Sequence, residues 1–335
     1  MRYLIALIFF SLPVVAATQT WEDRQVFNAS ADEAHLRVIS STDTFLFEPL
    51  IAGFIEENPG ISVEYLVTGT ADIDRIVRAA PDDFDVVISS AMDLQLKLAN
   101  DGFGRIIDDI PLPSWAQWHQ SLFAFTSEPA TIVINRAAFA GGPIPETRQQ
   151  LIEILRLRPD DFRGRVGTYD IRQSGLGYLF ATQDARASET YWRLMEVMGG
   201  LDVRLYCCSA DMIDDLVKGE IAVAYNVLGS YAEARAGSKD TVEIILPSDF
   251  QTTMMRTAMV LNGTSQPDAA TSFLKHLISN QTKRVGDPVT LPPLATHETG
   301  TDRETIGLDP ALMTFLDRLK RRRFLAEWEN AVIQR

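Results

Sequence analysis

Apolar segments of strand length alternate with longer amphipathic segments in the first third of the chain. The apolar segments fit buried strands, and they lie at residues 36–40, 61–66 and 85–88. The segments that follow them carry their apolar residues on one helical face, and they lie at 45–57, 71–80 and 91–100. Strands that alternate with helices in this way predict an open, mostly parallel sheet with helices on both faces.

The same alternation begins again in the middle of the chain. Further strand patterns lie at residues 130–135, 165–170 and 221–225, and further helical patterns at 147–157, 175–182, 188–198 and 212–218. We interpret these segments as a second, doubly wound α/β lobe. The segment 252–261 then carries the chain back, and the helical patterns at 268–279 and 309–333 are assigned to the first lobe.

These patterns predict how the chain divides into domains. We expect a signal peptide at residues 1–17, a discontinuous first lobe at 35–129 and 253–335, and a second lobe at 130–252. Two crossings of the chain between the lobes would form a hinge.

The N-terminal residues resemble a secretory signal. Arg2 supplies a positive charge, residues 3–15 are almost wholly apolar, and Ala16 and Ala17 are the small residues of a cleavage site. The apolar run is shorter than the roughly 18 to 20 residues that a membrane-spanning helix needs. We therefore expect export to the periplasm, with a mature chain that begins near Thr18.

Composition and charge exclude several classes of protein. The chain has 335 residues, of which 46% are hydrophobic and 23% charged, which is typical of globular domains. A formal net charge of -14 argues against binding to nucleic acid or to an anionic membrane. The two cysteines, Cys207 and Cys208, are adjacent, so no disulfide framework holds the fold, and we expect two thiols rather than a strained ring. We expect a monomer.

Four turns after predicted strands carry the candidate ligand-binding residues. Ligands of doubly wound sheets bind beyond the carboxyl ends of the strands, where helix N-termini offer free N–H groups. The candidates are Ser41 and Thr42, Ser89 and Ser90, Thr168, Tyr169, Asp170, Arg172 and Ser174, and Asn226, Gly229, Ser230 and Tyr231. The alternative for each turn is plain helix capping or strand packing. The hydroxyl groups and the guanidinium of Arg172 suit a small anionic or hydroxylated solute.

Catalytic motifs are missing from the sequence. It has no Gly-x-Ser-x-Gly elbow, no Walker loop and no zinc-protease histidine pair. The acidic clusters at residues 82–85 and 160–161 fit turns at the ends of elements. We predict no enzyme activity, no catalytic residue and no cofactor.

Several segments together resemble a known family. Residues 89–102 and 224–232 are similar to stretches of bacterial ABC-transporter substrate-binding proteins of the ferric-iron-binding-like group, and residues 40–43, 166–175 and 319–328 follow in the same order. The resemblance implies a type II periplasmic binding fold, in which two α/β lobes joined by two crossover strands close on a small solute. It also implies that the solute is handed to an inner-membrane permease.

The resemblance raises the question of a metal. Ferric-binding relatives hold iron with an adjacent tyrosine pair, whereas the matching stretch here has only Tyr231, after Gly229 and Ser230. The four histidines, at positions 35, 119, 276 and 297, are scattered. We therefore predict no bare metal site and expect a carboxylate, a phosphorylated sugar or phosphonate, or a ferric chelate. Direct binding of ferric ion, and presentation of the ligand to a membrane sensor kinase instead of a permease, remain as alternatives.

Overall fold

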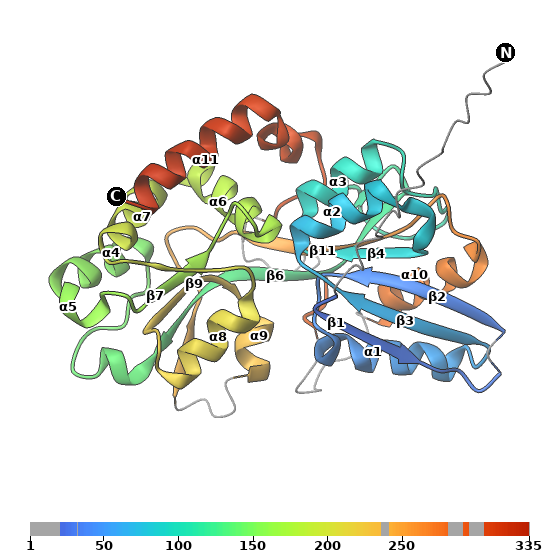
Figure 1. Cartoon of the computed structure of the whole chain (residues 1–335), viewed down its shortest axis with the longest axis horizontal. Coiled ribbons are helices and arrows are strands. Elements are labelled where there is room, and N and C mark those ends of the chain that lie inside the picture. The colour runs from blue at the N-terminus through green and yellow to red at the C-terminus, as the bar shows by residue number, and fades with distance from the viewer. Residues whose placement is uncertain (1–20, 32, 236–240, 281–290, 295–304, 335) are drawn as a thin grey trace, which may run out of the picture.

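The computed structural model describes residues 21–31, 33–235, 241–280, 291–294 and 305–334, and these form two α/β lobes side by side (Figure 1). The expected signal peptide, residues 1–17, lies outside the described residues. Within the described part of the chain, no helix has both the length and the apolar character needed to cross a membrane.

The first lobe has a parallel core between two layers of helices. Its parallel strands are β2 (Ala34–Ser40), β3 (Ile61–Val67) and β4 (Val86–Ser89), with β2 in the middle. The helices α1 (Thr44–Glu57) and α10 (Pro267–Asn280) cover one face, and α2 (Thr70–Ala79) and α3 (Met92–Asn100) cover the other (Figure 1). The periodic apolar residues, such as Phe47 and Phe54 of α1, are fully buried against the sheet.

An edge strand that the sequence pattern does not show completes this sheet. Strand β1 (Asp23–Phe27) pairs antiparallel with β3, from Asp23 opposite Val67 to Phe27 opposite Val63. Its residues are mostly exposed and polar, so no apolar alternation marks it. The consequence for function is that β1 brings the preceding residue, Glu22, to the carboxyl end of β3.

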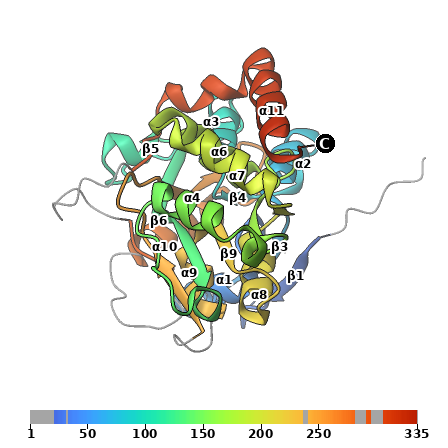
Figure 2. The same cartoon turned by 90° about the vertical axis from the view of Figure 1, so that its left-hand side faces the viewer.

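The second lobe repeats this plan around a smaller sheet. Its parallel strands are β9 (Val223–Leu228), β7 (Val166–Tyr169) and β8 (Arg204–Tyr206). In Figure 1, α6 (Gly175–Ala187) and α7 (Thr190–Gly200) lie on one face, and α8 (Ser209–Lys218) and α9 (Gly229–Arg235) on the other. Figure 2 looks onto this lobe, with α4 (Arg148–Leu157) in front of the strands. The short helix α5 (Pro159–Phe162) follows α4 in the chain.

One long strand belongs to both lobes. Strand β6 (Leu122–Asn135) pairs with β11 (Thr253–Val260) at residues 123–129 and with β9 at residues 130–134, all antiparallel. The short strands β5 (Gln117–Trp118) and β10 (Val242–Ile245) also pair with β6. The predicted two-lobed α/β class is thus confirmed, with antiparallel strands inserted between two parallel cores. Short 3-10 helices connect some elements, at η1 (Pro81–Asp83), η2 (Ser114–Ala116) and η3 (Arg136–Phe139).

A buried ion pair lies where β6 and β11 run together. Arg256 of β11 and Glu128 of β6 are each 1% exposed, and Arg256 Nη1 lies 2.5 Å from Glu128 Oε1. The other oxygen of Glu128 accepts a hydrogen bond from the hydroxyl of Ser230, which begins α9 in the second lobe. Glu128 therefore joins both crossing strands to the second lobe.

The C-terminal segment links the lobes once more. The 3-10 helix η5 (Pro310–Leu316) packs on α3 of the first lobe, whereas α11 (Arg318–Val332) packs on α7 of the second. Phe324 and Trp328 of α11 are buried in the core of the second lobe. The sequence pattern assigned all of 253–335 to the first lobe, but α11 packs on the second. The apolar stripe of a helix shows that the helix is packed, but it does not show which lobe it packs against.

The ion pair gives a first prediction, about stability. The variant Glu128→Leu leaves the charge of Arg256 buried without its partner, so we expect the free energy of unfolding to fall by about 3–5 kcal/mol. We expect a loss of about the same size for Arg256→Met, which leaves Glu128 buried without its partner. The double variant removes both charges and is expected to lose clearly less than the sum of the single losses. Urea denaturation of the four proteins measures this, and additive losses would show that the two side chains do not act as a pair.

Candidate functional site

A cavity of about 240 Å³ opens between the lobes, where the turns after the parallel strands face each other. Five of the residues predicted from the sequence line it, namely Ser41, Ser90, Tyr169, Ser174 and Tyr231. The first two follow β2 and β4 of the first lobe, and the others belong to the second lobe. This arrangement follows the rule that ligands bind beyond the carboxyl ends of parallel strands.

The other predicted residues are absent from the described lining of the cavity. Thr42, Ser89 and Thr168 are buried behind the turns, where Ser89 Oγ accepts a hydrogen bond from Ala91 N at 3.1 Å. Gly229 and Ser230 begin α9, and the Ser230 hydroxyl is engaged by Glu128. The remaining three, Asp170, Arg172 and Asn226, are occupied by ion pairs or hydrogen bonds within the protein.

Arg172 is paired within the second lobe. Its guanidinium donates from Nε and Nη2 to the two oxygens of Asp170, at 2.8 and 2.7 Å, and Nη1 lies 3.5 Å from Glu329 of α11. Burial alone would raise the pKa of Asp170, but the hydrogen bonds and charge of Arg172 outweigh it and hold this pKa below its ordinary value. Arg172 thus supports the turn rather than presenting a cation to the cavity.

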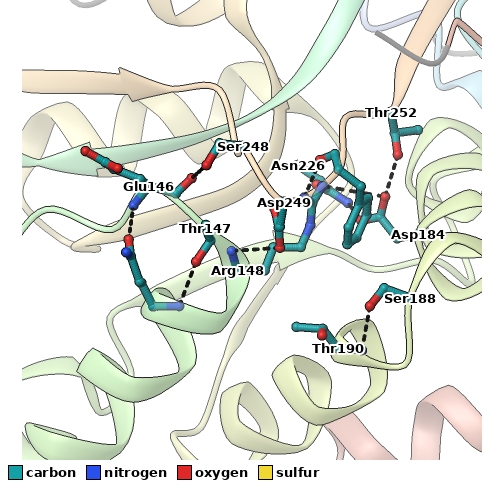
Figure 3. A network of polar contacts seen from close by, with 12 residues as sticks. Glu146, Thr147, Arg148, Asp184, Ser188, Thr190, Asn226, Ser248, Asp249 and Thr252 are labelled. Atoms are coloured by element: carbon teal, nitrogen blue, oxygen red, sulfur yellow. Dashed lines mark hydrogen bonds and ion pairs between the residues drawn. The ribbon is translucent and has the colours of Figure 1, made fainter. Parts of the chain in front are cut away.

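Asn226 is directed into the interior of the second lobe (Figure 3). Its Nδ2 donates to the fully buried carboxylate of Asp184 at 2.7 Å, and Thr252 donates to the other oxygen of Asp184, also at 2.7 Å. Tyr225 OH and Arg148 approach the same carboxylate, at 2.8 and 3.7 Å. The network ties β9 to the segment that returns toward β11, so Asn226 has a structural role that strand periodicity does not reveal.

Sequence reasoning missed much of the lining. The missed residues are Glu22, Asp43, Thr68, Gly69, Thr70, Asp72, Gln173, Leu176, Cys207, Cys208, Ser209 and Leu228. Residues 68–72 form the turn after β3 and the start of α2, so the same strand-end rule would have found them. No strand-end turn points to Glu22, because this residue precedes strand β1, which the sequence pattern does not show.

Hydroxyl groups of the cavity turns accept hydrogen bonds from backbone N–H groups of neighbouring turns. Ser41 Oγ accepts from Ser90 N at 3.2 Å, and Ser174 Oγ accepts from Gly177 N at 3.1 Å. Thr70 Oγ1 reaches from the first lobe to the start of α6 in the second, and accepts from the N–H groups of residues 175 and 176 at 2.8 and 3.1 Å. The backbone N–H groups of residues 90, 175, 176 and 177 are therefore satisfied within the protein rather than left for a ligand.

Two tyrosines form part of the second-lobe wall. Tyr169 OH and Ser209 Oγ are 2.5 Å apart, and the phenol of Tyr231 accepts a hydrogen bond from Asp43 N, across the cavity, at 3.3 Å. Burial raises the pKa of both phenols well above their ordinary value, so they stay neutral at physiological pH. A side chain at Gly177 would overlap with Tyr169, so the glycine allows this ring to pack against the start of α6.

The charge of the lining differs from what the sequence suggested. Glu22, Asp43 and Asp72 line the cavity, and its described lining contains no lysine, arginine or histidine. Burial, together with the negative charges of Asp43, Asp211 and Asp72, raises the pKa of Glu22. Burial also raises the pKa of Asp43, against the opposing effect of Arg235. The lining thus gives no support to the expected anionic solute.

Cys207 and Cys208 are joined by a disulfide bond and line the cavity together. The prediction of two thiols from the sequence is wrong. The pair lies in the turn between β8 and α8, where the side chains no longer alternate between opposite faces as they do on a strand. Asp211 Oδ2 lies 3.6 and 3.5 Å from the two sulfurs. Among the described residues, these three form the only group of potential metal ligands within 4.8 Å of one another, and the bonded sulfurs are not thiolates.

Comparison with known proteins assigns the chain to a family. The family model described as bacterial extracellular solute-binding protein matches residues 40–284. The chain belongs to this family. The predicted resemblance to substrate-binding proteins of ABC transporters is thereby confirmed. No curated protein sequence matches the chain.

Solved structures show the same fold for this solute-binding protein. A substrate-binding protein of an ABC transporter from Agrobacterium tumefaciens is 31% identical, with a TM-score of 0.85 over 92% of this chain and 98% of that one. AfuA from Actinobacillus pleuropneumoniae, with fructose-6-phosphate bound, has a TM-score of 0.68 at 14% identity, covering 90% and 99% of the two chains. Iron-bound HitA from Pseudomonas aeruginosa has a TM-score of 0.62 at 13% identity, covering 89% and 99%.

The disulfide gives a second prediction. The processed protein, unfolded without a reductant, is expected to show no alkylation by iodoacetamide in intact-mass measurement, because both sulfurs are in the bond between Cys207 and Cys208. After reduction two alkyl groups are expected. Cys207→Ser is the control, because it leaves one thiol that reacts without reduction. Two alkyl groups on the unreduced protein would contradict the bond.

Proposed function

We propose that this solute-binding protein is the periplasmic receptor of an ABC importer and captures a small polar solute between its lobes. The observation that carries the proposal is the cavity of about 240 Å³ whose walls come from the strand-end turns of both lobes. A solute in this cavity touches both lobes at once, so its binding energy favours the closed arrangement.

Direct contacts between the lobes support this mode of action. The Thr70 hydroxyl binds the N-terminus of α6, and Tyr231 binds the backbone of Asp43, so each lobe contributes a polar group to the other beside the cavity. Arg235 of the second lobe lies 3.5 Å from Asp43 of the first. These few hydrogen bonds and one long ion pair are individually weak, as expected of contacts that form and break when the lobes close and open.

The lining favours binding over chemistry. It presents several hydroxyl groups, but among the described lining residues no histidine or lysine lies beside a serine to activate it as a nucleophile. The expected signal peptide supports a location in the periplasm, and the family supports a membrane permease as the partner. A monomer suffices, because both walls of the cavity come from one chain.

The third prediction tests the receptor directly. Thermal unfolding of the processed protein is measured with amino acids, amines, sugars, sugar phosphates, carboxylates and ferric chelates, each present in excess. A bound solute at a hundred times its dissociation constant is expected to add about 2.7 kcal/mol of stability. The proposal fails if no class of solute raises the unfolding temperature. Binding without uptake in cells that contain the permease would favour a sensor kinase as the partner.

The fourth prediction concerns closure. Thr70→Val removes the acceptor for two N–H groups of α6, so we expect the solute affinity to fall about three- to tenfold. We also expect a larger radius of gyration of the liganded protein in small-angle X-ray scattering. Thr70→Ser keeps the hydroxyl and is expected to bind normally, and Thr314→Val, at an exposed position of η5, is a second control. Equal affinities of Thr70→Val and the native protein would contradict the role of this contact.

A further inference from the structure

The chemical class of the solute follows from the charges that remain uncompensated in the cavity, and this step rests on the proposed function. Asp72 forms a solvent-exposed pair with Arg75, at 2.9 Å, and Asp43 shares Arg235 with Asp214, which lies closer to it. Glu22 is different, because the charges that act on it most strongly are those of Asp43, Asp211 and Asp72, all of them negative. The lining of the cavity therefore carries unbalanced negative charge.

The acidic character continues beyond the cavity. A second hollow of about 530 Å³ shares Glu22, Asp43 and the disulfide with the first, and adds Asp23 and Asp211. Arg235 is the one basic residue in its described lining, and Asp214 holds it at 2.5 Å. A solute that approaches from this side meets mostly carboxylates, which attract cations and repel anions.

Several of the backbone donors that could bind an anion beside the cavity are already used, above all at the start of α6. The N–H groups at the start of α6 bind the hydroxyls of Thr70 and Ser174, and the carboxylate of Glu22 accepts from Gly69 N at the start of α2. An anion would have to displace these acceptors and approach Glu22. Arg256, on the crossing strand β11, is absent from the described lining of the cavity, and its Nη1 is held by Glu128.

We propose that the solute carries a positively charged nitrogen, an amine or a related organic cation, and that Glu22 is the residue that selects for it. The carboxylates of Asp43 and Asp72 complete the anionic side of the site, and the hydroxyls of Ser41, Ser90 and Ser209 orient the rest of the solute. A cation placed among these carboxylates relieves their mutual repulsion, which is a favourable contribution that neither a sugar phosphate nor a carboxylate can make.

A matched panel of solutes tests the class. The processed protein, freed of bound solute, is titrated calorimetrically with 1,4-diaminobutane, choline and arginine, with glucose as a neutral probe, and with citrate, glucose-6-phosphate and ferric citrate as anionic probes. We expect binding in the first group and none among the anions. Binding of an anion or of glucose alone overturns the charge assignment but leaves the receptor function intact. If no probe binds, the receptor proposal itself loses its support.

Variants separate the charge of Glu22 from its structural role. Glu22→Gln removes the charge but keeps an oxygen that can accept from Gly69 N, so we expect the melting temperature to stay and the affinity for the organic cation to fall at least about tenfold. Glu56→Gln, at an exposed position near the end of α1, is the control and is expected to bind normally. Equal affinity of Glu22→Gln and the native protein overturns the assignment.

The dependence on pH provides an independent measurement. The pKa values of Glu22 and Asp43 are raised in the empty protein, the first by burial and by Asp43, Asp211 and Asp72, the second by burial against Arg235. A cation binds the deprotonated carboxylates, so its affinity is highest above these raised pKa values and falls as the pH drops through them. The fall is expected to be smaller in Glu22→Gln. An affinity that rises on acidification overturns the proposal.

Discussion

The antiparallel pairing of β6 with β11 determines where every other part of the molecule lies. Because β6 is hydrogen-bonded to β11 in the first lobe and to β9 in the second, a single strand sets the angle between the two sheets. The buried pair of Arg256 and Glu128 holds the two crossing strands together in an interior where an unpaired charge would be costly. As a result the carboxyl ends of both parallel cores point at the same cavity.

The cavity also shows how side chains of the protein itself can occupy the donors of a helix N-terminus. Six helices begin near the facing turns, and their N-termini would ordinarily attract negative charge. Side-chain oxygens from Ser41, Thr70, Ser174 and Tyr231 accept hydrogen bonds from nearby N–H groups, and Glu22 adds a full negative charge. The carboxylates then dominate the electrostatic potential in the cavity. The hydroxyl groups that a sequence places at strand-end turns therefore do not by themselves predict the charge of a ligand.

The sequence predicted the fold better than it predicted the site. Alternating strand and helix patterns indicated both lobes, because burial of apolar residues leaves a periodic signal, and the strand-end turns pointed to Ser41, Ser90, Tyr169, Ser174 and Tyr231. The direction of a polar side chain leaves no such signal. Asn226 and Arg172 lie at the expected turns yet bind Asp184 and Asp170, and Glu22 enters the site through a polar edge strand without periodicity.

The C-terminal segment has a mechanical consequence for the closure of the lobes that we propose. Leu312 of η5 packs in the core of the first lobe, whereas Phe315 at the end of η5 packs on the second, as α11 does. The chain therefore passes between the lobes within η5, at a place separate from the crossing strands. Two bodies joined at two separate places rotate most freely about the line through both joints, and they resist twisting about other axes. If the lobes close as we propose, they do so in essentially one direction, so a solute would meet the same pair of opposing surfaces at each closure.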